Sequence, residues 1–264
     1  MQFQDQVVWI TGASSGIGEA LAYEFARAGA TLLLSARREA ELARVRAACP
    51  APERVHLAPL DLSQTDDIEA LVATWQQRLG RIDYLVNNGG ISQRALAHEA
   101  TMAVNRRVME VNFFGQIALT RAVLPYMLAQ QRGHLVVISS ITGKFGFPLR
   151  AAYAASKHAL HGFFESLYLE NRPQGIRVTL VNPGRINTDI PLHALTADGS
   201  PQGESDPSLA VGMSPTRCAQ LIIRAVRRGR YEVTIGSLGQ RIIVWLKRFW
   251  PTAFHVIAGR VPAR

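Results

Sequence analysis

The sequence predicts an α/β protein in which one parallel sheet of about seven strands is covered by helices on both faces. Short apolar segments of strand length alternate with helical patterns of ten or more residues almost to the end of the chain. A glycine-rich turn joins the first strand to the first helix. The 264 residues, 48% of them hydrophobic and 19% charged, are enough for a full core, so we expect residues 1–264 to form a single domain.

The alternation places the elements in order along the chain. The expected strands cover residues 7–11, 31–35, 55–60, 83–87, 135–139, 177–181 and 231–235. The expected helices cover residues 16–28, 38–48, 66–79, 103–131 and 215–228, with one more helix through Tyr153. Gly29 follows the first helical pattern directly, as a helix-ending glycine does. We expect the helix over 103–131 to be interrupted near Pro125, because proline lacks an N–H group and clashes with the preceding turn.

The turn after the first strand, residues 11–18, reads TGASSGIG and opens the first helix. Glycines let the backbone turn tightly and approach a pyrophosphate, whose negative charge is favoured at a helix N-terminus. We therefore predict a dinucleotide-binding turn. Its predicted binding residues are Gly12, Ser14, Ser15, Gly16, Ile17 and Gly18. The alternative is a glycine-rich turn with a steric role alone.

The end of the second strand indicates which dinucleotide is bound. An acidic residue at this position would bind the 2′-hydroxyl of the adenosine ribose, whereas arginine accommodates a 2′-phosphate. The chain has Arg37 and Arg38 here, with no acid before Glu39. A guanidinium group matches the geometry of a phosphate with paired hydrogen bonds, so the sequence favours NADP(H). The alternative is that both arginines are the solvated start of a helix.

Tyr153 and Lys157 are four residues apart in an amphipathic helical pattern, so both project from one face of the helix. A nearby cation favours the phenolate and lowers the pKa of a phenol from its usual value near ~10. General acid–base catalysis is most efficient when that pKa lies near the working pH. The pair is therefore a candidate proton donor, and the alternative is an ordinary half-buried tyrosine beside a solvated lysine.

In this order the motifs clearly resemble those of the short-chain dehydrogenase/reductase family over nearly the whole chain. The motifs are Thr11–Gly18, Asp61-Leu62, Asn87-Asn-Gly-Gly90, Asn112, Ser140, Tyr153-xxx-Lys157 and Pro183-Gly-Arg-Ile-Asn-Thr188. The resemblance implies a three-layer, doubly wound Rossmann-type fold with strand order 3-2-1-4-5-6-7. Within the family, the runs NNGG, SxRR and YAASKHALHGFFESL look most like the microsomal-type subgroup that acts on steroids, retinoids and lipid-like carbonyls.

The resemblance also implies four catalytic residues. Tyr153 would give a proton to the substrate carbonyl in reduction, or remove one in alcohol oxidation. Lys157 would lower the pKa of Tyr153 and bind the nicotinamide ribose. Ser140 would hold the carbonyl oxygen, and Asn112 would support a water molecule that refills the proton relay. Singly, Ser140 and Asn112 could equally be helix caps or buried hydrogen-bonding groups.

Further residues would bind the cofactor by the same resemblance. Asp61 would accept a hydrogen bond from the adenine, Leu62 beside it would also contact the cofactor, and Asn88 and Gly90 would line the adenosine ribose. Ile186 and Thr188 would fix the nicotinamide carboxamide, and Pro183 and Gly184 in the same segment are also predicted to bind the cofactor. The chain departs from the family at Gly89, where alanine is more usual, and we expect a small packing change beside the ribose.

These observations predict an NADP(H)-dependent carbonyl reductase or alcohol dehydrogenase that acts on an apolar substrate of steroid, retinoid, lipid or 3-ketoacyl type. A second reading is a scaffold or redox-sensing regulator that binds NADP(H) with little turnover. Residues 193–213, rich in Gly, Ser, Pro and Asp, would form a substrate loop that is mobile without ligand. The family implies a homodimer or homotetramer.

The net charge of +9 lies entirely in the last part of the chain. Residues 214–264 carry ten Lys or Arg and one acid, whereas residues 1–213 balance. Within this part, residues 236–264 form a basic, apolar extension that packs on its own domain, contacts a partner subunit, or lies on an anionic membrane surface. A nucleic-acid role lacks any recognition motif.

Cys49 and Cys218 belong to no CxxC motif and no His/Cys cluster, so we expect no metal site and no disulfide framework. We expect no leader, because the first residues lack a signal pattern, and no apolar stretch reaches the ~20 residues of a membrane span. The expected location is cytoplasmic, with peripheral membrane association as the alternative.

Overall fold

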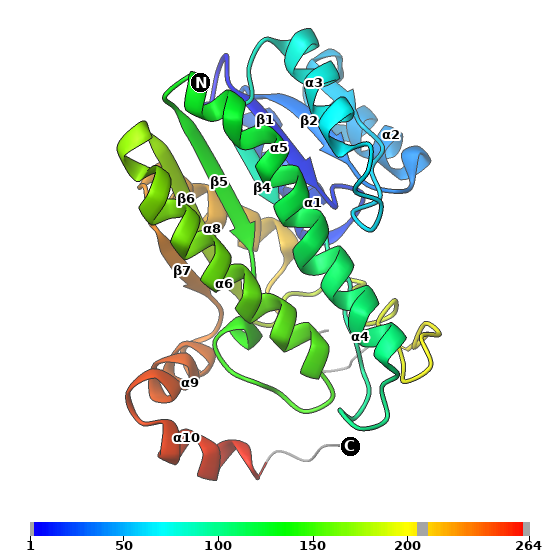
Figure 1. Cartoon of the computed structure of the whole chain (residues 1–264), viewed down its shortest axis with the longest axis vertical. Helices are drawn as coiled ribbons and strands as arrows, with labels where there is room; N and C mark the ends of the chain where they lie inside the picture. The colour runs from blue at the N-terminus through cyan, green and yellow to red at the C-terminus, as the bar shows by residue number, and fades with distance from the viewer. Residues whose placement is uncertain (1–2, 205–210, 261–264) are drawn as a thin grey trace.

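The computed structural model describes residues 3–204 and 211–260. These residues build one sheet of seven parallel strands in the order β3-β2-β1-β4-β5-β6-β7, with helices on both faces (Figure 1). The strands are β1 (Val7–Thr11), β2 (Thr31–Ser35), β3 (Val55–Leu57), β4 (Tyr84–Asn87), β5 (Gly133–Ile138), β6 (Ile176–Pro183) and β7 (Glu232–Ile235). The predicted fold class and strand order are confirmed.

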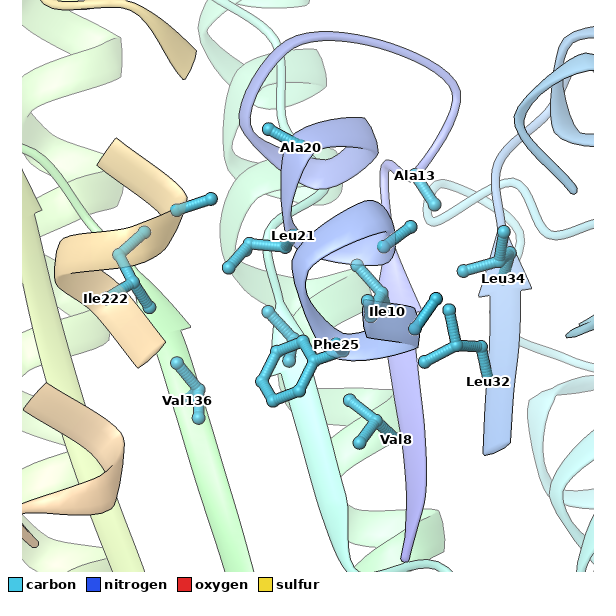
Figure 2. Close-up of a cluster of buried hydrophobic side chains, with 14 of the residues drawn as sticks. Val8, Ile10, Ala13, Ala20, Leu21, Phe25, Leu32, Leu34, Val136 and Ile222 are labelled. Carbon is cyan, nitrogen blue, oxygen red and sulfur yellow. The ribbon is translucent and has the colours of Figure 1, made fainter. Parts of the chain in front are cut away.

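The two helical layers follow from the alternation of side chains along each strand. The helices are α1 (Gly16–Arg27), α2 (Glu39–Ala48), α3 (Ile68–Leu79), α4 (Met102–Met109), α5 (Gly115–Ala129), α6 (Ala151–Asn171), α8 (Pro215–Arg227), α9 (Leu238–Phe249) and α10 (Pro251–Ala258). Val8 and Ile10 of β1 face α1, and Figure 2 shows Leu21 and Phe25 of α1 packed over them. Trp9, between them, belongs to the opposite cluster with α3, α5 and α6. Every central strand is therefore buried on both sides.

The predicted break near Pro125 is wrong. Pro125 lies inside α5, on its exposed side, where water can hydrogen-bond the carbonyl that loses its N–H partner. The irregularity lies earlier, in a π-helical turn over Glu110–Phe114 that joins α4 to α5. Turns of this kind are frequent at functional sites, and this one carries Asn112.

The extension after β7 folds into α9 and α10. Ser237 caps α9, and the Gln240 side chain accepts a hydrogen bond from the Ser237 N–H in return, which completes a capping box. Residues 261–264 of the predicted extension lie outside the described residues. Within the described part of the chain, no helix combines the length and apolar character needed to cross a bilayer.

Candidate active site

A cavity of about 1450 Å³ runs along the carboxyl ends of the strands. Open α/β sheets bind their ligands at this edge. The volume exceeds the roughly 300–1,000 Å³ typical of a small-ligand site, so there is room for a dinucleotide and a second molecule. All the predicted site residues line this cavity except Gly18 and Asn112, which lie behind its wall.

The glycine-rich turn has the conformation that a pyrophosphate site requires. Gly12 and Gly16 have φ angles of +62° and +58°, which other residues rarely adopt. A Cβ atom on Gly12 would lie 2.8 Å from the Cα of Gly89. Ser15 begins α1 without a side-chain cap, so the first N–H groups of the helix have no side-chain acceptor. These residues fit the phosphates of a dinucleotide.

Thr11 and Asn88 hold this turn against β4, a role that the sequence did not reveal for Thr11. The Thr11 hydroxyl accepts hydrogen bonds from the N–H groups of Asn88 and Gly89, both at 3.0 Å. The Asn88 amide donates to the carbonyl oxygens of Thr11 and Gly12 at 2.9 and 3.1 Å. The amide of Asn88 therefore builds the wall of the cavity, and its expected ribose contact remains a prediction.

At the far end of the cavity, Arg37 and Arg38 are exposed along the rim. Asp61 lies nearby, and its Oδ1 accepts hydrogen bonds from the N–H and hydroxyl groups of Ser63 at 2.9 and 2.8 Å. Burial raises the pKa of Asp61, but the Ser63 hydrogen bonds and the charges of Arg107 and Arg37 outweigh it and lower the pKa overall. This end of the cavity is therefore rich in cations around one ionised carboxylate.

Arg107 is a cavity residue that sequence reasoning missed. Its guanidinium lies 3.9 Å from Asp61 Oδ2. No local pattern marks it, because the contact depends on how α4 packs beside the loop after β3.

Ser140, Tyr153 and Lys157 meet at the inner end of the cavity. Ser140 begins the short 3-10 helix Ile141–Gly143 and accepts a hydrogen bond from the Thr142 N–H at 3.2 Å. Tyr153 is half-buried on α6 and hydrogen-bonds the Ser140 side chain. Lys157 is buried one turn further along, with its Nζ 5.7 Å from the centre of the Tyr153 ring. The structure thus brings together the three residues that the sequence predicted to be the proton donor, the carbonyl-binding hydroxyl and the ammonium group; these roles remain predictions.

The pKa of Tyr153 differs from the expectation. Burial raises it above the usual value, and the charge of Arg150 and the hydrogen bond to Ser140 offset only part of this rise. Lys157 does not offset this rise; its Nζ lies 5.7 Å from the centre of the Tyr153 ring and donates to the Ile138 carbonyl at 2.8 Å. Burial also lowers the pKa of Lys157, to about 8.

Asn112 lies behind Gly90 in the wall of the cavity. Its Oδ1 accepts from the Ile91 N–H at 2.7 Å, and its Nδ2 donates to the Ile91 carbonyl at 2.9 Å and to the Ser156 hydroxyl at 3.0 Å. The side chain therefore ties the chain after β4 to α6 beside Lys157. Its expected support of a water molecule remains a prediction.

The structure explains why position 89 is a glycine. A Cβ atom at Gly89 would lie 2.5 Å from a methyl group of Leu62, so the packing that excludes a side chain here is that of Leu62.

The Gln240 side chain fills the space over Gly184 and Gly236, which anchors α9 on the ends of β6 and β7. Gln240 thereby joins the cavity lining, another position that sequence reasoning missed.

A buried polar network supports the Ser140 turn from behind. His161 Nε2 lies 2.9 Å from the Asn182 side-chain oxygen, and Lys144 donates to His161 Nδ1 at 3.2 Å. Lys144 also pairs with Glu232 at 2.8 Å. The network joins α6, β6 and β7 to the chain that follows Ser140.

The lowered pKa values of two buried histidines lead us to predict that the protein loses stability in mild acid. Burial, aided by Arg177, lowers the pKa of His134 from 6.5 to about 4. Burial also lowers the pKa of His161 to about 4, with the charge of Lys144 adding to the shift and Glu232 and Asn182 opposing it. The folded protein therefore binds fewer protons than the unfolded chain below the ordinary histidine pKa, and its stability falls as the pH drops. We expect a loss of about 2 kcal/mol per histidine between about pH 7 and about pH 5.

Urea unfolding at the two pH values measures this effect. His134→Gln removes one of these groups and should reduce the loss of stability by about 2 kcal/mol. An unchanged dependence in that variant would contradict the assignment.

Within the described ranges, no group of three or more His, Cys, Asp or Glu side chains is placed to hold a metal ion. Cys49 and Cys218 are buried free thiols. The candidate site has three parts: the glycine-rich turn, the rim that carries Arg37 and Arg38, and the group of Ser140, Tyr153 and Lys157. Fold and cavity together place the protein among the oxidoreductases that hold a dinucleotide over the carboxyl edge of a parallel sheet.

Comparison with known proteins narrows this class. The family model described as short chain dehydrogenase matches residues 6–196. The chain is 44% identical over 259 residues to the Dehydrogenase/reductase SDR family protein 7-like of Anopheles gambiae, covering 96% of this chain and 81% of that protein. It is 38% identical over 257 residues to the human Dehydrogenase/reductase SDR family member 7, covering 95% of this chain and 76% of that one. The chain belongs to the short-chain dehydrogenase family of oxidoreductases, as the motifs predicted.

Solved structures agree with this assignment. A short-chain dehydrogenase from Streptomyces avermitilis superimposes with a TM-score of 0.82 at 31% identity, covering 97% of this chain and 96% of that chain. A short chain dehydrogenase/reductase from Burkholderia phymatum, in complex with NAD, gives a TM-score of 0.82 at 25% identity, covering 99% and 98%.

Proposed function

We propose that the protein is an NADP(H)-dependent oxidoreductase that interconverts a carbonyl group and a secondary alcohol on an apolar substrate. The observation that carries this proposal is the shared cavity, in which Ser140, Tyr153 and Lys157 meet at one end and Arg37 and Arg38 lie at the other. When bound, the cofactor would supply or accept the hydride. The glycine-rich turn would hold its phosphates, and the residues of the β6 end, Pro183 to Thr188, would hold its nicotinamide end.

The protein's own residues perform the proton chemistry. The Tyr153 hydroxyl donates its proton to the carbonyl oxygen in reduction and accepts one in oxidation. The Ser140 hydroxyl donates a hydrogen bond to the same oxygen and orients it. The charge of Arg150 favours the phenolate that Tyr153 becomes after proton donation, and we propose that Lys157 adds to this effect when substrate and cofactor are bound. Each hydroxyl aimed at the developing alkoxide contributes about 10²–10³ in rate, by analogy with oxyanion-hole donors.

The substrate end of the cavity supports an apolar substrate of steroid, retinoid, lipid or 3-ketoacyl type. The segments around Tyr153 and the C-terminal helices contribute many apolar side chains to the cavity lining. These are Ile141, Phe145, Phe147, Leu195, Met213, Ile243, Leu246, Phe254 and Ile257. Apolar walls with few polar groups favour ligands that bury hydrocarbon.

Residues 193–213 are proposed to cover this substrate. On the described side of the loop, the Leu195 N–H donates to the Ser92 carbonyl at 2.9 Å, and the Arg94 N–H donates to the Leu195 carbonyl at 2.8 Å. His193, Leu195 and Pro201 line the cavity. Residues 205–210, part of the predicted mobile segment, lie outside the described residues. We further propose a cytoplasmic homodimer or homotetramer, on the strength of the family alone.

Carbonyl-dependent oxidation of NADPH, measured across aldehydes, steroid ketones, retinal and 3-ketoacyl compounds, tests the reaction and the substrate class together. We expect turnover with one apolar class. Tight NADPH binding without turnover on any compound would contradict the proposal and favour the scaffold reading.

The cofactor preference predicts a specific loss in one variant. Arg37→Met/Arg38→Met removes both guanidinium groups from the rim and should weaken NADPH binding by about 10–100-fold, because charge-assisted bonds to the 2′-phosphate are lost. NADH, which has no 2′-phosphate, should bind as before. Arg46→Met, an exposed arginine of α2 outside the cavity, is the matched control. Equal losses for NADPH and NADH would contradict the predicted preference.

A further inference from the structure

One face of α9 is apolar and exposed. Leu238, Ile242, Trp245 and Phe249 are 71%, 52%, 50% and 56% exposed. Their spacings of four, three and four residues place them in a single stripe along the helix. None of the four lines the cavity. Half or more of each of these side chains is therefore open to solvent, and we call this stripe the outer face of α9.

The opposite side of the same two helices forms the cavity wall. Ile243 and Leu246 of α9 and Ile257 of α10 line the cavity. Phe254 of α10 is buried and packs on Phe145, with ring centres 5.2 Å apart. The pair α9–α10 is thus fixed to the substrate end of the site, and Figure 1 shows it outside the three layers, beyond β7.

This region concentrates the exposed apolar surface of the protein. Of the fourteen large hydrophobic side chains exposed in the described residues, eight belong to α9, α10 and the residue between them, and six of these eight do not line the cavity. Patches of this kind on a protein surface mark sites of protein or membrane interaction.

Cations flank the apolar stripe. Arg241, Lys247 and Arg248 lie on α9, and residues 233–260 contain no acidic residue. Arg248 lies over the Phe249 ring at 5.9 Å, and Lys247 over the Phe254 ring at 5.4 Å. Aromatic and aliphatic side chains mixed with Lys and Arg on one helix are typical of helices that lie in the interface of an anionic bilayer.

Charge decides between the partners that an apolar face could bind. A second copy of this chain, related by a two-fold axis, would bring the cations of both faces together without an acid to pair them. An anionic lipid surface supplies the opposite charge and an apolar interior for the aromatic rings.

We propose that the outer face of α9 docks the protein on anionic bilayers and that the apolar substrate then passes from the bilayer into the cavity beside α9 and α10. The first half of this proposal, docking, is argued from the surface of the protein alone. The second half, substrate entry, rests on the proposed function. The inner side chains Ile243, Leu246 and Ile257 give an apolar path between the bilayer and Tyr153.

Co-sedimentation of the full chain with vesicles tests the docking half without substrate or cofactor. We expect binding to vesicles of phosphatidylcholine with phosphatidylglycerol, and weak binding to phosphatidylcholine alone. Arg241→Glu/Arg248→Glu should reduce binding by about tenfold or more, since each cation near an anionic surface contributes roughly 1 kcal/mol. Arg46→Glu/Arg78→Glu, which changes the net charge equally at exposed sites on α2 and α3, should leave binding unchanged.

A second pair of variants separates insertion from simple charge attraction. Trp245→Ser/Phe249→Ser removes two rings of the outer face and should weaken vesicle binding to a similar degree. Met102→Ser, an exposed apolar side chain on α4, is the control. Absence of wild-type binding to anionic vesicles, or unchanged binding in both outer-face variants, would overturn the proposal. Self-association that disappears in these variants, without vesicle binding, would assign the face to a second copy instead.

Turnover tests the entry half. We expect both outer-face variants to reduce a long-chain ketone embedded in anionic vesicles about tenfold more slowly than the wild type. Because neither variant alters a cavity residue, both should keep the wild-type rate on a short, water-soluble aldehyde. Equal rates on the embedded ketone would overturn substrate entry from the bilayer. Absence of turnover on both substrates would instead contradict the proposed function, and vesicle binding would still report on docking.

Discussion

Replacing Tyr153 by phenylalanine is expected to lower turnover by about 10³-fold or more while NADP(H) binding stays within about twofold. The substitution removes one oxygen atom and keeps the ring, so the packing beside Lys157, 5.7 Å from the ring centre, is retained. The lost hydroxyl is the group that we propose to exchange a proton with the substrate. Its loss leaves Ser140 as the remaining hydroxyl near the developing charge.

The measurement compares NADPH oxidation with NADPH binding in the same preparation. Tyr168→Phe is the matched control, because Tyr168 lies on the same helix, packs on Tyr231 and does not line the cavity. Turnover in Tyr153→Phe within about tenfold of wild type would refute the mechanism. A parallel loss of NADPH binding would show instead that the phenol oxygen holds the cofactor-binding side of the cavity together.

The raised pKa of Tyr153 makes its phenol a weaker acid than an ordinary tyrosine, although it remains the protonated form that the proposed reduction requires. Proton loss in the oxidation direction needs additional stabilisation of the phenolate. The charge of Arg150 already lowers the pKa of Tyr153, and Lys157, whose own pKa burial lowers to about 8, is the second cation that we propose for this role.

Gly18→Ala is expected to weaken NADP(H) binding by about 10–100-fold and to destabilise the fold by about 1–3 kcal/mol. The added Cβ would overlap the Gly12 carbonyl oxygen and lie 2.5 Å from the Asn88 amide nitrogen. Both groups belong to the hydrogen-bonded wall of the cofactor turn, since Asn88 donates to that same Gly12 oxygen. The wall must therefore open to admit one methyl group, and the glycine-rich turn moves with it.

Isothermal titration with NADP(H) and urea unfolding measure the two effects. Gly162→Ala is the control, because a Cβ on Gly162 of α6 meets no atom within 4 Å. Alanine is the better helix former, so this control should be neutral or more stable by up to about 1 kcal/mol. Normal NADP(H) affinity in Gly18→Ala would show that the turn accommodates the methyl group and that its close packing is not needed for binding.

The sequence by itself determined the fold class, the strand order through the family resemblance, and the positions of the main motifs. These features are local. The TGASSGIG turn lies between its own strand and helix, and Tyr153 and Lys157 are one helical turn apart, so the spacing alone places them together. The continuous apolar run of β1 likewise predicts burial on both faces.

Only the tertiary structure decided how distant segments meet. Thr11 and Asn88 are separated by 77 residues, and their contact depends on the pairing of β1 with β4. Arg107 reaches Asp61 only because α4 packs across the loop after β3. Such contacts leave no periodic signal in the chain.

Burial explains the remaining differences. The pKa of Tyr153 is raised because its surroundings exclude water, an effect that four-residue spacing to Lys157 cannot reveal. The basic extension was open to several readings because its composition suits packing and membranes equally. Its division into an inner face on the cavity and an outer face in solvent follows from how α9–α10 packs on Phe145, a contact between segments more than a hundred residues apart in the chain.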